Sequence, residues 1–375
     1  MSHLRINYRV FTVFLAVGLV MLAAAGLVVV GAGQARLRAS FGEHLADVAT
    51  QTAATVDSYV YRRAIDTSIL AAVPDVRREA ALASAAPLDA AAVREYDRLW
   101  QQQHTVPEAL APLMRNAAST FLGETGRNDQ TYRELVLADR QGRLAAASGM
   151  TTDYFQGDEE WFTRAFGDGV RGRLNVGGVT WDDSAATWAL ELSAPVLDPS
   201  GAQLAGVLKA VVDVREMAAT VSAMRLGKTG DAALVTDEGK IVLGSLQPKV
   251  DTPFFAADLL REHMQAIASQ ETPATVSFGA LAPDGQSRLV GIGISQLRAS
   301  YPHLKWLVAV SQNESDLFAP VRFQLWSLLG VLALTAIAVL GLALWFSLRL
   351  AAPPPDEELH LVRHPVVGTI DGEGV

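Results

Sequence analysis

Aromatic and acidic residues gather in one short part of the chain, between residues 153 and 191. The aromatic residues are Tyr154, Trp161, Phe162, Trp181 and Trp188, and the acidic residues are Asp153, Asp158, Glu159, Glu160, Asp182, Asp183 and Glu191. Aromatic walls with a few polar groups are the usual make-up of a small-molecule pocket. Carboxylates beside aromatic rings suit an amine or a quaternary ammonium group, through ion pairing and cation–π contact.

This window therefore predicts a ligand-binding site, to which a lysine on a later strand also belongs. The predicted site residues are Tyr154, Asp158, Trp161, Phe162, Trp181, Asp182, Trp188 and Lys209. A structural explanation stands beside the functional one. The aromatic residues would then form core, and the acids from Asp158 to Glu160 would cap a helix and complement its dipole.

Lys209 interrupts an otherwise apolar strand, and three positions are open to it. Its ammonium group would meet a ligand carboxylate, pair with a nearby acid, or lie on the solvated face of the strand. The last is the commoner position for a lysine on a half-buried strand. Asp213, at the end of the same strand, is expected to end the strand and start the next helix.

The sequence carries no recognisable catalytic or metal centre. Cysteine is absent, which excludes disulfides, thiol nucleophiles and Cys-ligated zinc. His360 and His364 have the spacing of one helix face, but no third ligand lies nearby. No G-x-S-x-G, P-loop or Rossmann motif is present, and a net charge of −9 argues against a nucleic-acid partner. We therefore expect no enzyme activity, no metal and no cofactor.

Two uncharged apolar segments predict membrane helices. Val10–Gly33 has 24 residues and Phe323–Leu348 has 26, whereas about 20 residues cross a bilayer core. We place the spans at residues 10–33 and 321–348. A cleaved signal peptide is the alternative for the first span, but its apolar region is usually only about 7–15 residues long.

The basic residues beside these spans predict the orientation. Arg5 and Arg9 precede the first span and Arg349 follows the second, and such flanks are typical of the cytoplasmic side. Residues 1–9 and the tail at 349–375 are then cytoplasmic. Residues 34–320 form one periplasmic domain of an inner-membrane protein that crosses the membrane twice.

Between the spans, the pattern predicts helices that alternate with two β-rich sets. The predicted helices cover 35–76, 89–103, 107–121, 214–224 and 256–269, and the predicted strands fall within 134–148, 173–181, 187–198, 204–214, 230–245, 272–279, 287–296 and 305–312. Each β-rich set is a hairpin, an insertion and a three-stranded antiparallel meander. This order indicates an internal duplication at the level of topology.

Four stretches together resemble a double Cache domain, the extracytoplasmic ligand-binding domain of many bacterial chemoreceptors, histidine kinases and cyclases. They are residues 134–148, 153–162, 190–214 and 226–245. The resemblance implies an α+β fold in which two stacked, PAS-like antiparallel-sheet modules lie on a long N-terminal helix. It implies a membrane-distal module at about 80–214, a proximal module at about 215–312, and a ligand in the distal module.

The sequence departs from the amino-acid-binding pattern of that family. There an arginine precedes a Trp-Tyr pair and holds the ligand carboxylate, whereas here Glu159 and Glu160 precede Trp161 and Phe162. In that family, an acid in a later strand holds the amine of the ligand. In this chain, Val211 stands at the corresponding position. A free α-amino acid is therefore disfavoured, and an amine, an organic acid held by Lys209 or a neutral metabolite remains open.

The expected function is that of a membrane-anchored receptor for a small molecule. The tail is too short for an output domain, so the signal would pass through the membrane helices to a separate signalling partner. A homodimer through the long helices is compatible with this reading. The alternative is an envelope module that uses the same fold to bind a protein without a small ligand. The sequence does not identify the ligand or the partner.

Overall fold

The structure of the chain is a computed structural model, and it describes residues 8–87, 89–103, 106–182, 187–224, 226–244, 252–255, 260–263, 276–282 and 285–350. The chain divides into two compact units. One runs from Gln34 to Pro320, and the other combines the segments on either side of it. The unit from Gln34 to Pro320 contains all of the strands.

The helical elements follow one another along the chain with strands between them. They are α1 (Tyr8–Ala71), α2 (Pro74–Ala85), α3 (Ala90–Gln103), η1 (Glu108–Leu110), η2 (Leu113–Arg115), α4 (Ala117–Asn128), α5 (Glu160–Phe166), α6 (Arg215–Ser222), α8 (Leu297–Ser300), α9 (Glu314–Leu317) and α10 (Ala319–Leu350). The helix after Asp89 and the helix after Val214 are confirmed. The long helix predicted over 35–76 is confirmed as far as Ala71, but Pro74 begins the separate helix α2, which was not predicted. Asp89 caps α3 as its type suggests, since its Oδ1 accepts hydrogen bonds from Ala91 N and Ala92 N.

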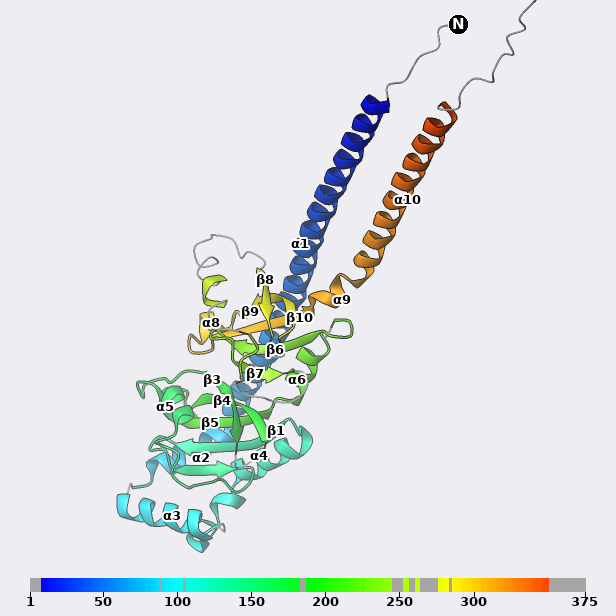
Figure 1. Cartoon of the computed structure of the whole chain (residues 1–375). Coiled ribbons are helices and arrows are strands. Elements are labelled where there is room, and N and C mark those ends of the chain that lie inside the picture. The colour runs from blue at the N-terminus through cyan, green and yellow to red at the C-terminus, as the bar shows by residue number, and fades with distance from the viewer. Residues whose placement is uncertain are drawn as a thin grey trace, which may run out of the picture. The chain divides into compact units, whose positions relative to one another are not determined.

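The strands form two antiparallel sheets of five (Figure 1). They are β1 (Tyr132–Asp139), β2 (Leu144–Ala147), β3 (Asn175–Asp182), β4 (Thr187–Leu197), β5 (Leu204–Asp213), β6 (Asp231–Thr236), β7 (Ile241–Gly244), β8 (Val276–Leu281), β9 (Ser287–Ile294) and β10 (Trp306–Asn313). The orders β2-β1-β5-β4-β3 and β7-β6-β10-β9-β8 are the same order of strands in two successive parts of the chain. The predicted duplication is therefore confirmed. We call β1–β5 the first sheet and β6–β10 the second sheet.

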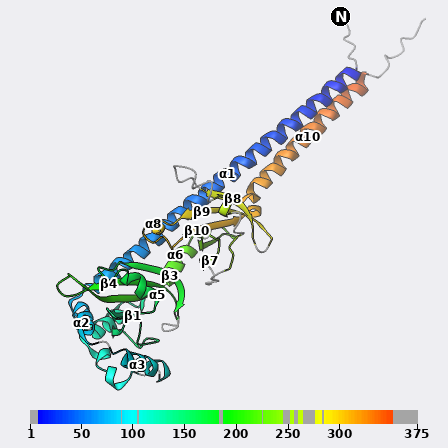
Figure 2. The same ribbon diagram turned by 90° about the vertical axis from the view of Figure 1, so that its left-hand side faces the viewer.

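Helix α1 packs against both sheets through one apolar stripe. The stripe residues Leu45, Ala49, Val56, Val60 and Ala64 are each at most 1% exposed, and they join one core with residues of the two sheets. Thr52 lies in the stripe, but its hydroxyl donates to Val48 O at 2.7 Å, so its burial leaves no hydrogen bond unmade. Figure 2 shows α1 running along the second sheet towards the first.

Two glycines of β9 allow the backbone of α1 to lie directly against the second sheet. A Cβ atom on Gly291 would lie 2.3 Å from Leu45 C, and one on Gly293 would lie 2.2 Å from Ala49 O. These are backbone atoms of a helix, so they cannot rotate away as a flexible side chain would. The glycines are therefore required by the close approach of helix and strand.

One predicted helix is wrong in its bounds. The segment 107–121 contains the two short 3₁₀ helices η1 and η2, and α4 then runs on to Asn128. Asn116 starts α4, because its side-chain oxygen accepts a hydrogen bond from Ser119 N at 2.8 Å. Of the helix predicted at 256–269, residues 260–263 are helical and most of the rest lies outside the described residues, as do the terminal segments 1–7 and 351–375.

Among the described residues, one helix is long and apolar enough to cross a membrane, and it is α1 from Leu15 onward. The shorter apolar stretch of α10 that the structure describes is Leu329–Leu342. Large apolar side chains of both helices are exposed, among them Leu27 and Leu334. The second membrane span stays a prediction.

We predict that Gly291→Ala destabilises the protein by ~2 kcal/mol or more, because the added methyl group overlaps the α1 backbone. The measurement is the thermal unfolding midpoint of the full chain in detergent. Gly149→Ala is the matched control, since a Cβ atom there meets nothing within 4 Å. Equal midpoints for the two variants would contradict the proposed close approach.

Candidate functional site

The loop between β2 and α5 is fastened to α3, and this sets where α5 begins. The carboxylate of Asp97 accepts hydrogen bonds from Tyr154 N at 2.9 Å and from Phe155 N at 3.0 Å. The indole N–H of Trp100 donates to Thr151 O at 2.8 Å. The backbone of the predicted site is thus held by side chains that come from more than 50 residues earlier in the chain.

Helix α5 buries its aromatic residues against the first sheet. Trp161 and Phe162 meet edge to face with ring centroids 5.8 Å apart, and Phe162 stacks on Phe166 at 5.3 Å. Tyr154 joins the same cluster of buried residues and contacts the ring of Tyr96 at 5.9 Å. Tyr154 and Phe162 are therefore buried in the same cluster as Trp161, and a ligand role for them stays a prediction.

Trp181 and Trp188 lie on the opposite face of the first sheet from this cluster. They are partners in register on β3 and β4, with ring centroids 5.8 Å apart. Trp188 packs against the core under α1, whereas Trp181 is 50% exposed. Because successive residues of a strand alternate between faces, Asp182 points to the face of α5. The five aromatic residues thus form two separate sets, and a ligand role for Trp181 and Trp188 stays a prediction.

Lys209 is buried among three carboxylates, each from a different strand. Its Nζ lies 3.5 Å from Glu191 Oε1, 3.6 Å from Glu134 Oε2 and 3.7 Å from Asp182 Oδ2. Direct charge-assisted hydrogen bonds are about 2.7–2.9 Å long, so the ammonium group is shared by the three acids. The side chain is not on the solvated face, and pairing with nearby acids is the option that the structure selects.

The surroundings of Lys209 keep it protonated. Burial by itself would lower the pKa of Lys209, but the charges of Glu134, Glu191 and Asp182 outweigh it and raise the pKa above its ordinary value. The ammonium group also lies 5.8 Å from the ring centroid of Trp161, within the range of a cation–π contact. We call Lys209, Glu134, Asp182, Glu191 and Trp161 the lysine cluster.

More negative charge lies at the start of α5. Burial raises the pKa of Asp153 to about 6, and the neighbouring charges of Glu159 and Asp97 add to this effect. Burial likewise raises the pKa of Glu159. Glu159 occupies the N-cap position of α5 without a side-chain capping bond, so the expected capping role is wrong for this residue. Asp158 is exposed.

A cavity of about 390 Å³ adjoins Trp161 and is lined from both sheets. The first sheet contributes Thr180 and Glu191, and the second module contributes Ile241, His303 and Trp306. Trp161 is 3% exposed, and its indole Nε1 has no hydrogen-bond acceptor among the described residues. A buried N–H without an acceptor is unusual. The side chain of Trp161 lines the cavity, although its Nε1 is itself buried.

His303 also ties the two sheets together next to the cavity. Its Nε2 lies 2.7 Å from Val176 O of β3. The sequence does not predict that residues 241 and 303–306 line this cavity, because nothing in the pattern around them indicates that they meet β3. Only the tertiary structure brings these residues next to β3.

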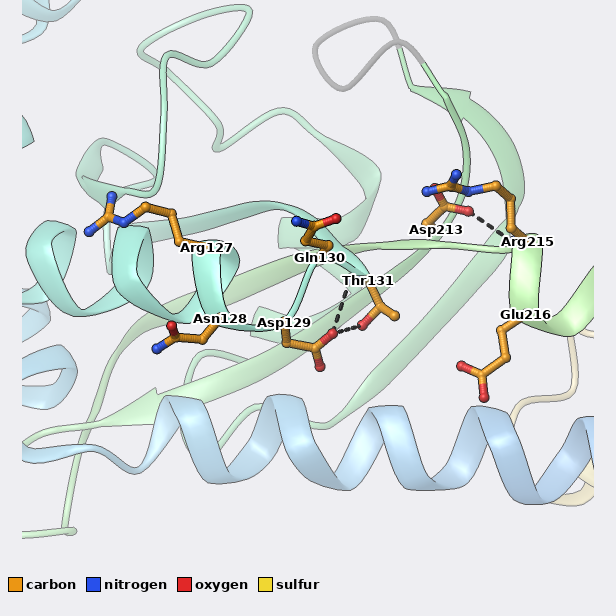
Figure 3. A pocket seen from close by; sticks show the side chains of 8 residues that line it. All are labelled: Arg127, Asn128, Asp129, Gln130, Thr131, Asp213, Arg215 and Glu216. Carbon is orange, nitrogen blue, oxygen red and sulfur yellow. Dashed lines mark hydrogen bonds and ion pairs between the residues drawn. The ribbon is translucent and has the colours of Figure 1, made fainter.

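A second cavity of about 620 Å³ lies where β1 begins and β5 ends (Figure 3). Several of its charged groups are paired within the protein: Asp213 with Arg133 at 2.7 Å and Arg215 at 2.9 Å, and Asp129 with Arg63 of α1 at 3.0 Å. Figure 3 shows the side chains of Asp129 and Glu216 pointing towards α1. The expectation that Asp213 starts the next helix is confirmed, since its Oδ1 accepts from Arg215 N at 2.8 Å.

In the part of the chain that the structure describes, no three His, Asp or Glu side chains are grouped so that they could hold a metal ion.

Neither a family model nor a curated protein matches this chain by sequence. Solved structures do resemble it. The ligand-binding domain of a Pseudomonas aeruginosa amino-acid chemoreceptor in complex with GABA is 18% identical with a TM-score of 0.45, over 73% of this chain and 100% of that chain. That of the Campylobacter jejuni chemoreceptor Tlp3 in complex with L-norvaline is 12% identical with a TM-score of 0.48, over 75% and 94%.

The extracellular domain of a putative histidine kinase is 14% identical with a TM-score of 0.40, over 61% of this chain and 86% of that chain. These three matches are the ligand-binding or extracellular domains of two chemoreceptors and a putative histidine kinase. At these identities and TM-scores, no ligand and no residue role is carried over to this chain.

We predict that Asp153→Asn raises the stability of the protein at neutral pH and not at acidic pH. The pKa of Asp153 is raised from 3.8 to about 6 in the folded state, so the folded state binds the extra proton between these values. The stability of the wild-type chain then falls as pH rises from about 4 through about 6, and levels off above. The side chain of asparagine does not titrate, so the variant does not lose stability over this pH range.

The measurement is the thermal unfolding midpoint of variant and wild type from acidic to neutral pH. The difference between them is expected to grow in favour of the variant as the pH rises. Asp168→Asn is the control, because Asp168 is exposed. A difference that stays constant over this range would show that Asp153 does not titrate as described.

Proposed function

We propose that residues 34–320 form a sensor domain that binds a small molecule in the cavity beside Trp161. The observations that carry the proposal are a cavity of about 390 Å³ whose lining includes Trp161, and the indole N–H of Trp161, which is buried without a hydrogen-bond acceptor among the described residues. Ligand pockets are mostly apolar and aromatic with a few polar groups that orient the ligand. Here Trp161, Trp306 and Ile241 supply the apolar and aromatic lining. Thr180, His303 and Glu191 supply the polar groups.

A ligand in this cavity contacts both modules at once, because its walls come from β3 and β4 on one side and from residues 241 and 303–306 on the other. Such a ligand stabilises the arrangement of the modules in which these walls fit it, and it shifts the population towards that arrangement. Helix α1 packs on both sheets. A change in the arrangement of the two modules therefore changes the surface against which α1 packs. The signal then leaves the domain along this helix.

The proposal extends to the membrane. The apolar segments 10–33 and 321–348 anchor the domain in the inner membrane, with the sensor domain in the periplasm and both termini in the cytoplasm. A separate signalling partner reads the change in the membrane helices. The apolar and exposed side chains of α1 and α10 support this part of the proposal, because such surfaces are unfavourable in water.

We expect a thermal-shift screen of the full chain in detergent against organic acids, neutral metabolites, amines and amino acids to yield a stabilising compound. At 100 times its dissociation constant, a ligand adds ~2.7 kcal/mol to the stability of the folded state. Trp161→Phe removes the indole N–H and is expected to abolish or strongly reduce the shift.

Trp181→Phe is the matched control, because Trp181 lies on the other face of the first sheet, and this variant is expected to keep the shift. A compound that stabilises Trp161→Phe as well as the wild type would place the ligand elsewhere. If no compound in the panel stabilises the protein, the alternative of a protein-binding envelope module is favoured.

The absence of cysteine makes the membrane topology directly measurable. We predict that a membrane-impermeant maleimide labels Ser200→Cys, on an exposed turn, in intact spheroplasts. Ser2→Cys and Thr369→Cys are expected to be labelled only after the membrane is permeabilised. Labelling of Thr369→Cys in intact spheroplasts would contradict the second span.

A further inference from the structure

We infer that the lysine cluster is an ammonium-binding site occupied by the chain's own Lys209, so that the wild-type protein does not take a free primary amine there. The groups around Nζ are those that a receptor for a primary ammonium ion needs. They are three carboxylates within 3.7 Å and one indole ring with its centroid at 5.8 Å. The tethered ammonium group fills the place that an amine ligand would take.

The site is built from elements distant in the sequence. Glu134 comes from β1, Asp182 from β3 and Glu191 from β4, and α5 contributes the ring of Trp161. The side chains of Glu134 and Asp182 are 7% and 6% exposed, and that of Glu191 is 28% exposed. Buried carboxylates need a cation nearby, because water does not solvate them fully. Lys209 supplies this cation from within the sheet.

Replacing Lys209 by alanine would leave a space in the lysine cluster that has the shape of the removed atoms. Lys209→Ala removes three methylene groups and the ammonium group, which together correspond to n-propylammonium. The three acids then share no counter-ion, and a cation of this size restores both the charge and the packing. A neutral molecule of the same shape restores only the packing.

The inference bears on the ligand of the proposed sensor. If the cavity beside Trp161 binds a small molecule, that ligand is recognised without an ammonium group at the position of Lys209. The position of Lys209 is thereby closed to the amino group of an amine or of an α-amino acid. The lysine cluster and the cavity share Trp161 and Glu191. The lysine cluster is tested with variants of Lys209 and the cavity with Trp161→Phe, so the failure of one proposal is distinguishable from the failure of the other.

The experiment compares the thermal unfolding midpoints of the wild-type chain, Lys209→Ala and Lys209→Met in detergent. Each is titrated with n-propylammonium chloride, with sodium chloride at equal ionic strength and with n-propanol. We expect Lys209→Ala to have a lower midpoint than the wild type, and n-propylammonium to raise it saturably by on the order of 3 °C. Sodium chloride and n-propanol are expected to give no such rise.

Lys209→Met is the control for the filled site, because its side chain occupies the volume without a charge, and it is expected not to respond. A saturable rise in the wild type or in Lys209→Met would overturn the inference. So would a Lys209→Ala chain that shows no saturable response, or that fails to fold in the presence of n-propylammonium.

A second measurement needs no variant. The chain has five lysines, at 209, 228, 240, 249 and 305, and acetylation of the native protein followed by peptide mass spectrometry compares their reactivity. We expect the amine of Lys209 to react many times more slowly than that of the exposed Lys228, because it is buried and protonated among acids. Equal rates at the two lysines would overturn the inference even if no variant folds.

Discussion

The contact of α1 with both sheets is the interaction on which the rest of this structure depends. One helix supplies a single apolar stripe, and that stripe joins the first and second sheets in one core. The contact is close enough that β9 must have glycine where the helix backbone passes. This helix thereby joins the two duplicated modules through one core, and the contact of His303 with Val176 O of β3 joins them beside the cavity.

The two faces of the first sheet differ in their side chains. One face carries the apolar residues that meet α1, together with Trp188. The other carries Glu134, Glu191, Lys209 and the residues that pack under α5. Alternation along each strand sends neighbours in the sequence to opposite faces. A strand such as β5 can therefore be buried along its whole length and still place one charged group in a polar site.

On the face of the first sheet that packs under α5, acidic side chains outnumber basic ones. One ammonium group serves three carboxylates, and two more acids at the start of α5 have raised pKa values. Net negative charge in a partly buried region is costly, and Lys209 reduces that cost without any ligand. Trp161 links the cluster to the cavity, since its ring faces the ammonium group and its side chain also lines the cavity.

The sequence by itself determined the order of helices and strands, the duplication and the stripe of α1, because these follow from local periodicity and turn residues. It also located the acids and aromatic residues from which the site is drawn. It misjudged the segment 107–121, where a helix was expected and two 3₁₀ turns precede α4. Only the tertiary structure decided that Trp181 and Trp188 lie apart from Trp161, that Lys209 is paired within the sheet, and that the second module closes the cavity. These are matters of strand pairing and of one sheet packing on another, and no local pattern of residues encodes them.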